Sequence, residues 1–162
     1  MQAPIGNPIQ LKAHDGSFLE VQLGWQKPFG NSKKTFPAWN QFILKRTVED
    51  RVKIKSRWNL SVLTVQEDGS CLFAEDQGKP NQEFVIETGD NAFFFVSYCF
   101  GRTLQCTPEG QVKCDNFNRL DWEKWQLVVP ESEDIITVPA LKGAAYSIVG
   151  MLIDTASKFL YP

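Results

Sequence analysis

The chain of 162 residues is poor in the residues that build metal centres and catalytic sites. It contains one histidine, His14, and its four cysteines, Cys71, Cys99, Cys106 and Cys114, form no Cys-x-x-Cys pair. A zinc site of the usual ligand spacing therefore has little to build on. No Gly-x-Ser-x-Gly, His-Glu-x-x-His or phosphate-binding Gly-Lys motif is present either. We therefore expect a protein that is not an enzyme and that uses no metal and no cofactor.

Strong charge of one sign is lacking too. The chain has 17 basic and 19 acidic residues, a formal net charge of −2, so no bulk attraction to nucleic acid is expected. Residues 1–8, an N-terminal extension, contain no apolar run of signal-peptide length. This predicts a cytoplasmic protein with reduced cysteines, of which Cys106 and Cys114 are expected to be buried free thiols. A disulfide between Cys106 and Cys114, which flank one turn, is the alternative for an exported protein.

The most informative feature is an internal repeat in an aromatic-rich sequence. Apolar residues make up 43% of the chain and aromatic residues 12%, which favours one β-rich domain with a substantial core. Two segments match without a gap at a constant offset of 41 residues. The matched pairs include Leu63 with Leu104, Gly69 with Gly110, and Phe84 with Trp125. We predict that the aromatic residue near the end of each copy belongs to the core.

A third, more divergent copy precedes these two. It opens at residues 9–19 and closes at residues 39–44, with a longer loop predicted over residues 24–37. The three repeats cover residues 9–46, 52–88 and 93–129. Gly16 and Gly101 each precede a leucine by three residues, and Leu60 takes the place of this glycine in the middle copy.

Each copy has the pattern of β-strands joined by tight turns. Residues 51–57 alternate between basic and smaller or apolar side chains, a period of two. Asp68-Gly69 and Glu109-Gly110 stand where the chain must reverse, since glycine supplies the positive φ that hairpin turns need. Copies of about 41 residues cannot bury a sheet face alone, so they must share one core in a closed, pseudo-threefold arrangement.

Residues 11–19, 70–74 and 84–87 carry a resemblance to a known family. They resemble the β-trefoil proteins and, among these, the fascin-like group. The resemblance implies an all-β β-trefoil over residues 9–129, and fascins imply binding to actin. Filament bundling is less expected, because it needs two sites and this chain has one trefoil. Ricin-type lectins share the fold, but their repeated Gln-x-Trp motif is absent here.

After the trefoil, residues 130–162 are expected to form an acidic linker and a C-terminal helix. Apolar residues at helical spacing are Leu141, Ala145, Ile148, Leu152 and Phe159. The helix is expected to pack on the trefoil; the alternatives are a partner's groove, self-association through residues 139–160, or a membrane surface. Only 11 residues separate the charges of Lys142 and Asp154, whereas a transmembrane helix needs roughly 20 apolar residues.

One candidate partner-binding site is a basic stripe on a predicted strand. Alternation would place Arg51, Lys53, Lys55 and Arg57 on one outward face. An ordinary solvated strand face is the simpler interpretation. The alternative is a patch for an acidic partner: the surface of actin, an anionic lipid or a sulfated sugar.

The second candidate site consists of Trp25 and Phe29 in the predicted long loop, since exposed aromatic residues dominate many binding sites. His14 is expected in a surface turn and not in a catalytic dyad. Together these features predict a non-catalytic binding module, with a protein partner such as actin as the first hypothesis. A carbohydrate-binding lectin is the second, and an assembly subunit acting through the C-terminal helix is the third.

Overall fold

The computed structural model describes residues 8–21, 26–31, 37–48, 51–130 and 134–136. Within these ranges twelve strands form one antiparallel sheet. The strands are β1 (Gln10–Ala13), β2 (Phe18–Val21), β3 (Pro28–Asn31), β4 (Phe42–Arg46), β5 (Arg51–Ser56), β6 (Val62–Val65), β7 (Cys71–Ala74), β8 (Phe84–Gly89), β9 (Ala92–Ser97), β10 (Thr103–Cys106), β11 (Val112–Asn116) and β12 (Trp125–Val128). Short 3-10 helices are η2 (Pro37–Asn40), η3 (Pro80–Gln82) and η4 (Asp121–Glu123).

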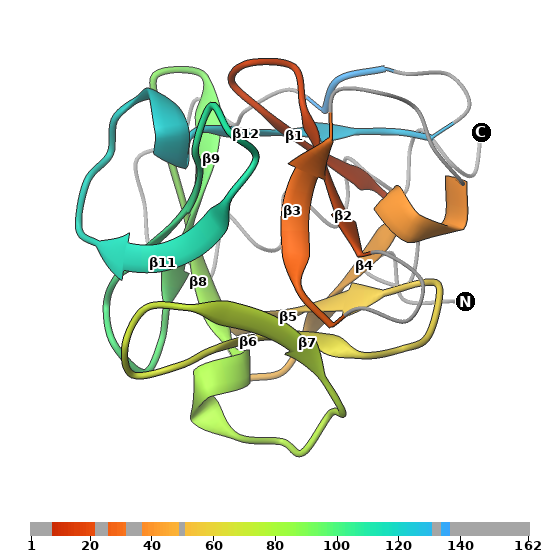
Figure 1. Cartoon of the computed structure of the whole chain (residues 1–162), viewed down its shortest axis with the longest axis vertical. Coiled ribbons are helices and arrows are strands. Elements are labelled where there is room, and N and C mark those ends of the chain that lie inside the picture. The colour runs from red at the N-terminus through yellow and green to blue at the C-terminus, as the bar shows by residue number, and fades with distance from the viewer. Residues whose placement is uncertain (1–7, 22–25, 32–36, 49–50, 131–133, 137–162) are drawn as a thin grey trace.

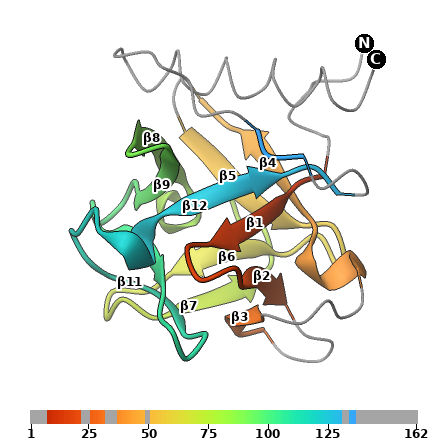
Figure 2. The ribbon, with the colours of Figure 1, turned by 90° about the horizontal axis from the view of Figure 1, so that it is seen from above.

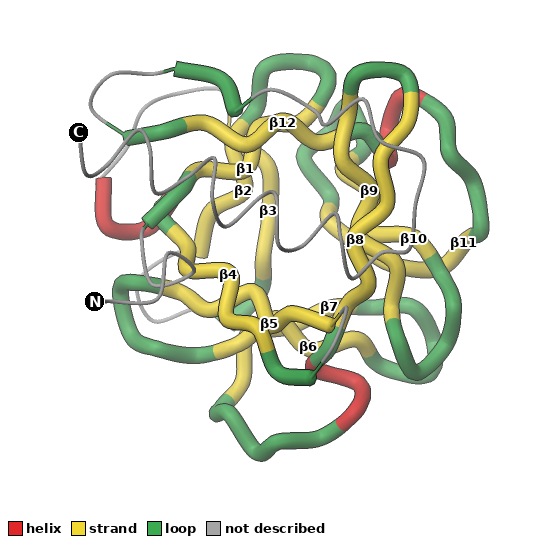
Figure 3. The backbone as a smooth tube through the Cα atoms, turned by 180° about the vertical axis from the view of Figure 1, so that it is seen from behind, coloured by secondary structure: helices red, strands yellow, loops and turns green. Residues whose placement is uncertain are grey.

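Six of these strands close into a barrel. The neighbours in order are β1, β12, β9, β8, β5 and β4, which surround a central axis in Figure 3. Ile9, just before β1, and Phe42, at the start of β4, complete the ring. Each of these two residues donates its backbone N–H to the carbonyl of the other at 2.8 Å. Closure pairs the strand edges that an open sheet would leave exposed.

The twelve described strands fall into three structurally equivalent units of four, β1–β4, β5–β8 and β9–β12. Each unit pairs the start of its first strand with the start of its last strand. The equivalent pairs are Ile9 with Phe42, Val52 with Phe84, and Phe93 with Trp125. Units two and three correspond at the 41-residue offset found in the sequence, because both Val52 to Phe93 and Phe84 to Trp125 span 41 positions.

The other six strands form three hairpins that cover one end of the barrel (Figure 1). Seen from the side in Figure 2, the hairpin strands β3, β7 and β11 lie below the barrel strands β4, β5, β8 and β12. Each hairpin is hydrogen-bonded to the next. The bonds run from Gly30 N–H to the Gly110 carbonyl (2.7 Å), from Phe73 N–H to the Gln26 carbonyl (2.6 Å), and from Cys114 N–H to the Gly69 carbonyl (2.7 Å). Each hairpin therefore donates one of these bonds and accepts another, so the three bonds form a closed ring. In all three hairpins the donating residue lies four positions after the accepting residue.

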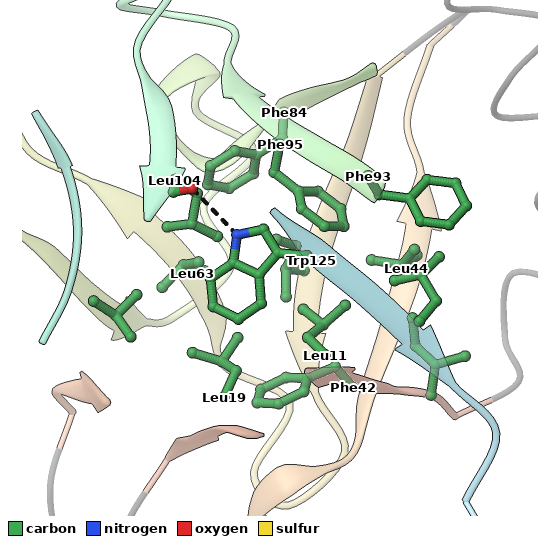
Figure 4. Packing of buried hydrophobic residues seen from close by; sticks show 14 of the residues in the cluster. Leu11, Leu19, Phe42, Leu44, Leu63, Phe84, Phe93, Phe95, Leu104 and Trp125 are labelled. Carbon is green, nitrogen blue, oxygen red and sulfur yellow. Dashed lines mark hydrogen bonds between the residues drawn. The ribbon is translucent and has the colours of Figure 1, made fainter. Parts of the chain in front are cut away.

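The core lies on the axis that the three units share. The closing aromatic residues Phe42, Phe84 and Trp125 are each 0% exposed, which confirms their predicted core position. The indole Nε1 of Trp125 donates to the carbonyl of Leu104 at 3.1 Å (Figure 4). Because this N–H is satisfied, the largest side chain of the core is buried without leaving a donor unpaired.

The first copy and the chain end differ from the sequence expectations. The loop expected over residues 24–37 contains strand β3 and the start of η2. The reason is that the first copy, like the other two, forms a complete hairpin, β2–β3, at the covered end of the barrel. After β12, the chain reverses: Val129 N–H donates to the carbonyl of Asp134 and Ile136 N–H to that of Leu127, both at 2.8 Å. The helix predicted within residues 139–160 lies outside the described residues. No helix in the described ranges is long and apolar enough to cross a membrane.

Replacement of Leu60 by glycine is expected to stabilise the protein. Leu60 has a φ of 64° and is 58% exposed, at the turn position where the other units have Gly16 and Gly101. A left-handed conformation costs a residue with a Cβ about 1–2 kcal/mol, of which the larger unfolded-state entropy of glycine offsets part. We expect Leu60→Gly to raise the free energy of unfolding by about 0.5–1 kcal/mol in urea titrations. Glu67→Gly, the control in another exposed turn, should lower it.

Gly110→Ala tests the contact between hairpins. Gly110 has a φ of +85°, and an added Cβ would lie 2.5 Å from the Gly30 carbonyl oxygen. We expect this substitution to lower the free energy of unfolding by about 3 kcal/mol. Gly78 is the matched control, because it has a φ of +66° but nothing within 4 Å of its added Cβ. Equal losses for Gly78→Ala and Gly110→Ala would contradict a special role for the hairpin contact.

Candidate functional site

The predicted basic stripe lies on β5 and in the turn that follows it. Arg51, Lys53 and Lys55 are half-buried and alternate with fully buried residues, as the period of two predicts. Arg57 lies beyond the end of the strand, is exposed, and donates a hydrogen bond from Nη1 to the side-chain oxygen of Gln41. The four cations therefore occupy one strand and one turn, in two different environments.

Two of these cations are engaged in ion pairs within the chain. Arg51 Nη1 lies 3.2 Å from Glu83 Oε1, and its guanidinium stacks 4.0 Å from the Tyr98 ring centroid. Lys53 Nζ lies 2.7 Å from Asp76 Oδ1, and this hydrogen bond lowers the pKa of the Asp76 carboxyl. Both pairs join β5 to the segment around η3, so these two cations stabilise unit two. Little of their charge is left for an external anion.

The predicted aromatic pair is not seen as one site. Trp25 lies outside the described residues. Phe29 lies on β3, where it pairs with Glu20 across the hairpin and forms an isolated bridge with Gln111 of the neighbouring hairpin. Its side chain is half-buried. Phe29 therefore takes part in the sheet and in the contact between hairpins, and is not a loop residue.

The structure instead forms a groove from residues that the sequence analysis did not group. Two adjoining cavities of about 500 Å³ each, both wide open to solvent, lie between the β8–β9 turn, the β1–β2 turn and the η4 segment. In Figure 1 the β8–β9 turn (green, top left) lies near η4 (teal) and the β1–β2 turn (red). The first cavity is lined by residues 118–124 and Asp90. The second is lined by residues 12–16 and 90–92, with Lys124 and Gln126. We call the two cavities together the groove.

Trp122 and Leu120 give the first cavity its apolar surface. They are 43% and 66% exposed, whereas the large aromatic residues of the core are fully buried. Trp122 belongs to η4 and lies three residues before the core residue Trp125 in the chain. Its neighbour Glu123 is buried and accepts the Leu120 N–H at 2.9 Å, which fixes the start of η4. The exposed indole is thus held on a short, hydrogen-bonded turn.

Arg119 holds the segment that precedes η4. Its Nε and Nη2 donate to the two carboxylate oxygens of Glu87 on β8, at 3.0 and 3.3 Å. Its Nη1 donates to the hydroxyl of Thr103 and to the carbonyl of Phe117, the latter at 2.9 Å. A two-pronged arginine–carboxylate contact fixes geometry as well as charge. The charge of Arg119 is therefore compensated, and its guanidinium is held rigidly at the edge of the cavity.

The second cation of the first cavity, Lys124, is also paired. Lys124 Nζ lies 3.2 Å from Asp121 Oδ1. Asp90 occupies the two-residue β8–β9 turn with Asn91, and the two have φ values of 52° and 58°. Positive φ at both central residues is typical of the tight turns that join antiparallel strands, and Asp and Asn tolerate it best. The cavity thus presents hydrogen-bonding groups beside an exposed indole, and its lining has three acidic and two basic side chains, of which both basic ones are paired with carboxylates.

Comparison of units two and three explains why the groove is open. At the 41-residue offset, Arg51 corresponds to Ala92 and Glu83 to Lys124. In unit two, Arg51 and Glu83 form an ion pair that fills this position. In unit three, Ala92 and Lys124 line the second cavity. Because unit three has an alanine in place of Arg51 and a lysine in place of Glu83, no equivalent ion pair forms and the second cavity stays open.

Sequence reasoning missed Asp90 and Trp122, and it assigned His14 only to a surface turn. His14 is exposed in that turn, as predicted, and it also lines the second cavity. A usable signal was present in the repeat alignment. The third copy has Ala92 where the second has Arg51, and Trp122 where the second has Asn81. An apolar aromatic residue at a position that is polar in the equivalent unit indicates a specialised surface.

Comparison with known proteins identifies the fold only. No protein-family model and no curated protein matches the chain. Among solved structures, the designed threefold-symmetric protein ThreeFoil matches with a TM-score of 0.67 and 20% sequence identity, over 75% of this chain and 97% of that one. The fold is a β-trefoil. Membership of the fascin-like group is a finer prediction that this match does not test.

The cysteines of the trefoil are free thiols with contrasting environments. Cys71, Cys106 and Cys114 are buried, and Cys99 is exposed. Burial raises the pKa of the Cys106 and Cys114 thiols to about 12 and that of Cys71 still further. Since a thiolate is the reactive species, the three buried thiols are expected to be inert. Within the part of the chain that the structure describes, no cluster of three His, Cys, Asp or Glu side chains could hold a metal ion.

Thiol titration at pH 8 is expected to find one fast-reacting group, Cys99, and all four after denaturation. Cys99→Ser should remove the fast phase. Rapid labelling of two or more thiols in the native protein would contradict this assignment.

The same burial predicts that the free energy of unfolding falls at alkaline pH, because the folded-state pKa values of the Cys106 and Cys114 thiols exceed the ordinary value of 9.0. The stabilisation by protonated thiols is complete below about pH 9 and is lost as pH rises toward 12.

Proposed function

We propose that this β-trefoil is a non-catalytic carbohydrate-binding module whose site is the groove. The observation that carries the proposal is the exposed indole of Trp122 in a cavity of about 500 Å³ beside fixed hydrogen-bonding groups. Cavities of about 300–1,000 Å³ with an apolar or aromatic surface and a few convergent polar groups are typical ligand sites.

The chemistry of a sugar ring complements this surface. One face of a pyranose presents C–H groups, which pack on an aromatic face, while its hydroxyl groups both donate and accept hydrogen bonds. The carboxylate of Asp90 and the amide oxygen of Asn118 are acceptors, whereas the ammonium of Lys124 and the amide of Asn118 are donors. Because Arg119 and Lys124 are paired with Glu87 and Asp121, neither cation of the first cavity is free to bind an anion, which favours a neutral polyhydroxylated ligand over an anionic one.

Binding of a protein partner is the competing hypothesis. The resemblance to fascins implies actin, and the basic stripe was its candidate site. Arg51 and Lys53 are occupied by Glu83 and Asp76, so within the described residues only Lys55 and Arg57 of the stripe have no ion-pair partner. An anionic protein surface therefore has less support here than a glycan. Self-association through residues 139–160 lies outside the described residues and stays a prediction.

A glycan array probed with the full chain and with Trp122→Ala tests the proposal. We expect the parent protein to bind a subset of neutral glycans, and Trp122→Ala to weaken this binding at least tenfold through loss of the stacking surface. Trp122 is 43% exposed, so its removal should leave the fold intact, which circular dichroism would check.

Trp58→Ala is the matched control, because Trp58 is also partly exposed, at 38%, but does not line the groove. It should bind as the parent protein does. Absence of binding to every glycan on the array, or equal binding by the parent protein and Trp122→Ala, would contradict the proposal. Pelleting of the parent protein with actin filaments in the same buffer, lost on neutralising Lys55 and Arg57, would support the competing hypothesis.

A further inference from the structure

We infer that the second cavity is a second sugar subsite of the same groove, so that the ligand is an oligosaccharide of two or more units and not a single sugar. This inference rests on the proposed function and specifies its substrate class. The observation behind it is that the two cavities adjoin: Asp90 and Lys124 line both of them. A ligand seated against Trp122 therefore lies beside two side chains that also line the second cavity.

The chemistry of the second cavity differs from that of the first. It has no Phe, Tyr or Trp, and its side chains include Lys12, His14, Asp15, Asn91 and Gln126. Such a surface offers many hydrogen-bond donors and acceptors but no large stacking face like the indole of Trp122. The first cavity would thus supply stacking that depends little on sugar identity. The second would discriminate between sugars by the positions of their hydroxyl groups, because an unmatched buried polar group is costly.

Both sides of the second cavity are held by local backbone structure. On one side, the tight β8–β9 turn carries Asp90 and Asn91. On the other, Asp15 Oδ1 accepts the Ser17 N–H at 2.9 Å, which fixes the β1–β2 turn that carries His14. Groups that are already positioned before binding lose less conformational entropy when a ligand arrives. The second cavity therefore has the fixed geometry that selective recognition requires.

Unit two supplies an internal comparison for the same location. In unit two, the paired side chains of Arg51 and Glu83 occupy the position that Ala92 and Lys124 leave open in unit three. A backbone position equivalent to Ala92 thus accommodates an arginine in this fold. A long uncharged side chain, Ala92→Gln, should consequently occupy the second cavity without placing a second cation beside Lys124, which also lines the first cavity.

The experiment measures affinity against ligand length by isothermal titration calorimetry. The probes are neutral gluco-, galacto-, manno- and N-acetylglucosamine oligomers of one to six units, applied to the full chain. For the bound series, we expect affinity to rise at least tenfold between one and three units and then to level off. His14→Ala/Gln126→Ala and Ala92→Gln should each abolish this gain while leaving the affinity for a single unit within about twofold.

Two controls separate the outcomes. Lys79→Ala, an exposed residue beside η3 that does not line the groove, should keep the full length dependence. Trp122→Ala should lower affinity at every length. Binding that is independent of length, or a gain that survives in both second-cavity variants, would overturn the inference and leave the proposed function standing. Absence of binding at every length would overturn both.

Discussion

The trefoil depends on a cyclic set of backbone contacts between its three hairpins. Residues 30, 73 and 114 donate their N–H groups to the carbonyls of residues 110, 26 and 69, so each hairpin contacts both others. A two-stranded hairpin alone is marginally stable in water, and three hairpins sharing one core remove that weakness. This arrangement, together with barrel closure between Ile9 and Phe42, places turns from distant parts of the sequence at one rim. The groove follows from that placement.

The groove exists because the threefold symmetry is incomplete. In unit two, long charged side chains from β5 reach across to the η3 segment and pair there, which stabilises the unit. Unit three has Ala92 and Phe94 where unit two has Arg51 and Lys53, so no equivalent pairs form. Functional surfaces often depart from the rules that stabilise the rest of a fold. In unit three, the counterparts of these two ion pairs are absent, and the surface beside the exposed Trp122 is open.

Rigidity and the pairing of both cations are the properties that make this surface suited to a sugar. Arg119 reaches Glu87 with two hydrogen bonds, and Glu123 holds the Leu120 N–H, so the segment that carries Trp122 has little freedom. The contact with Glu87 also compensates the charge of Arg119, as Asp121 does for Lys124. A weakly hydrated indole beside such groups binds a ligand that is apolar on one face and polar at its edge.

The sequence by itself determined the repeated and local features of this protein. The 41-residue offset, the alternation along β5 and the aromatic residues that close each unit are patterns along the chain, and they predicted three β-rich units sharing a core. Only the tertiary structure decided which side chains meet. The pairing of Arg51 with Glu83 and the meeting of His14, Asp90 and Lys124 in one groove join residues far apart in the sequence. Such contacts are set by barrel closure and by how the units are rotated about their shared axis, and no local pattern encodes them.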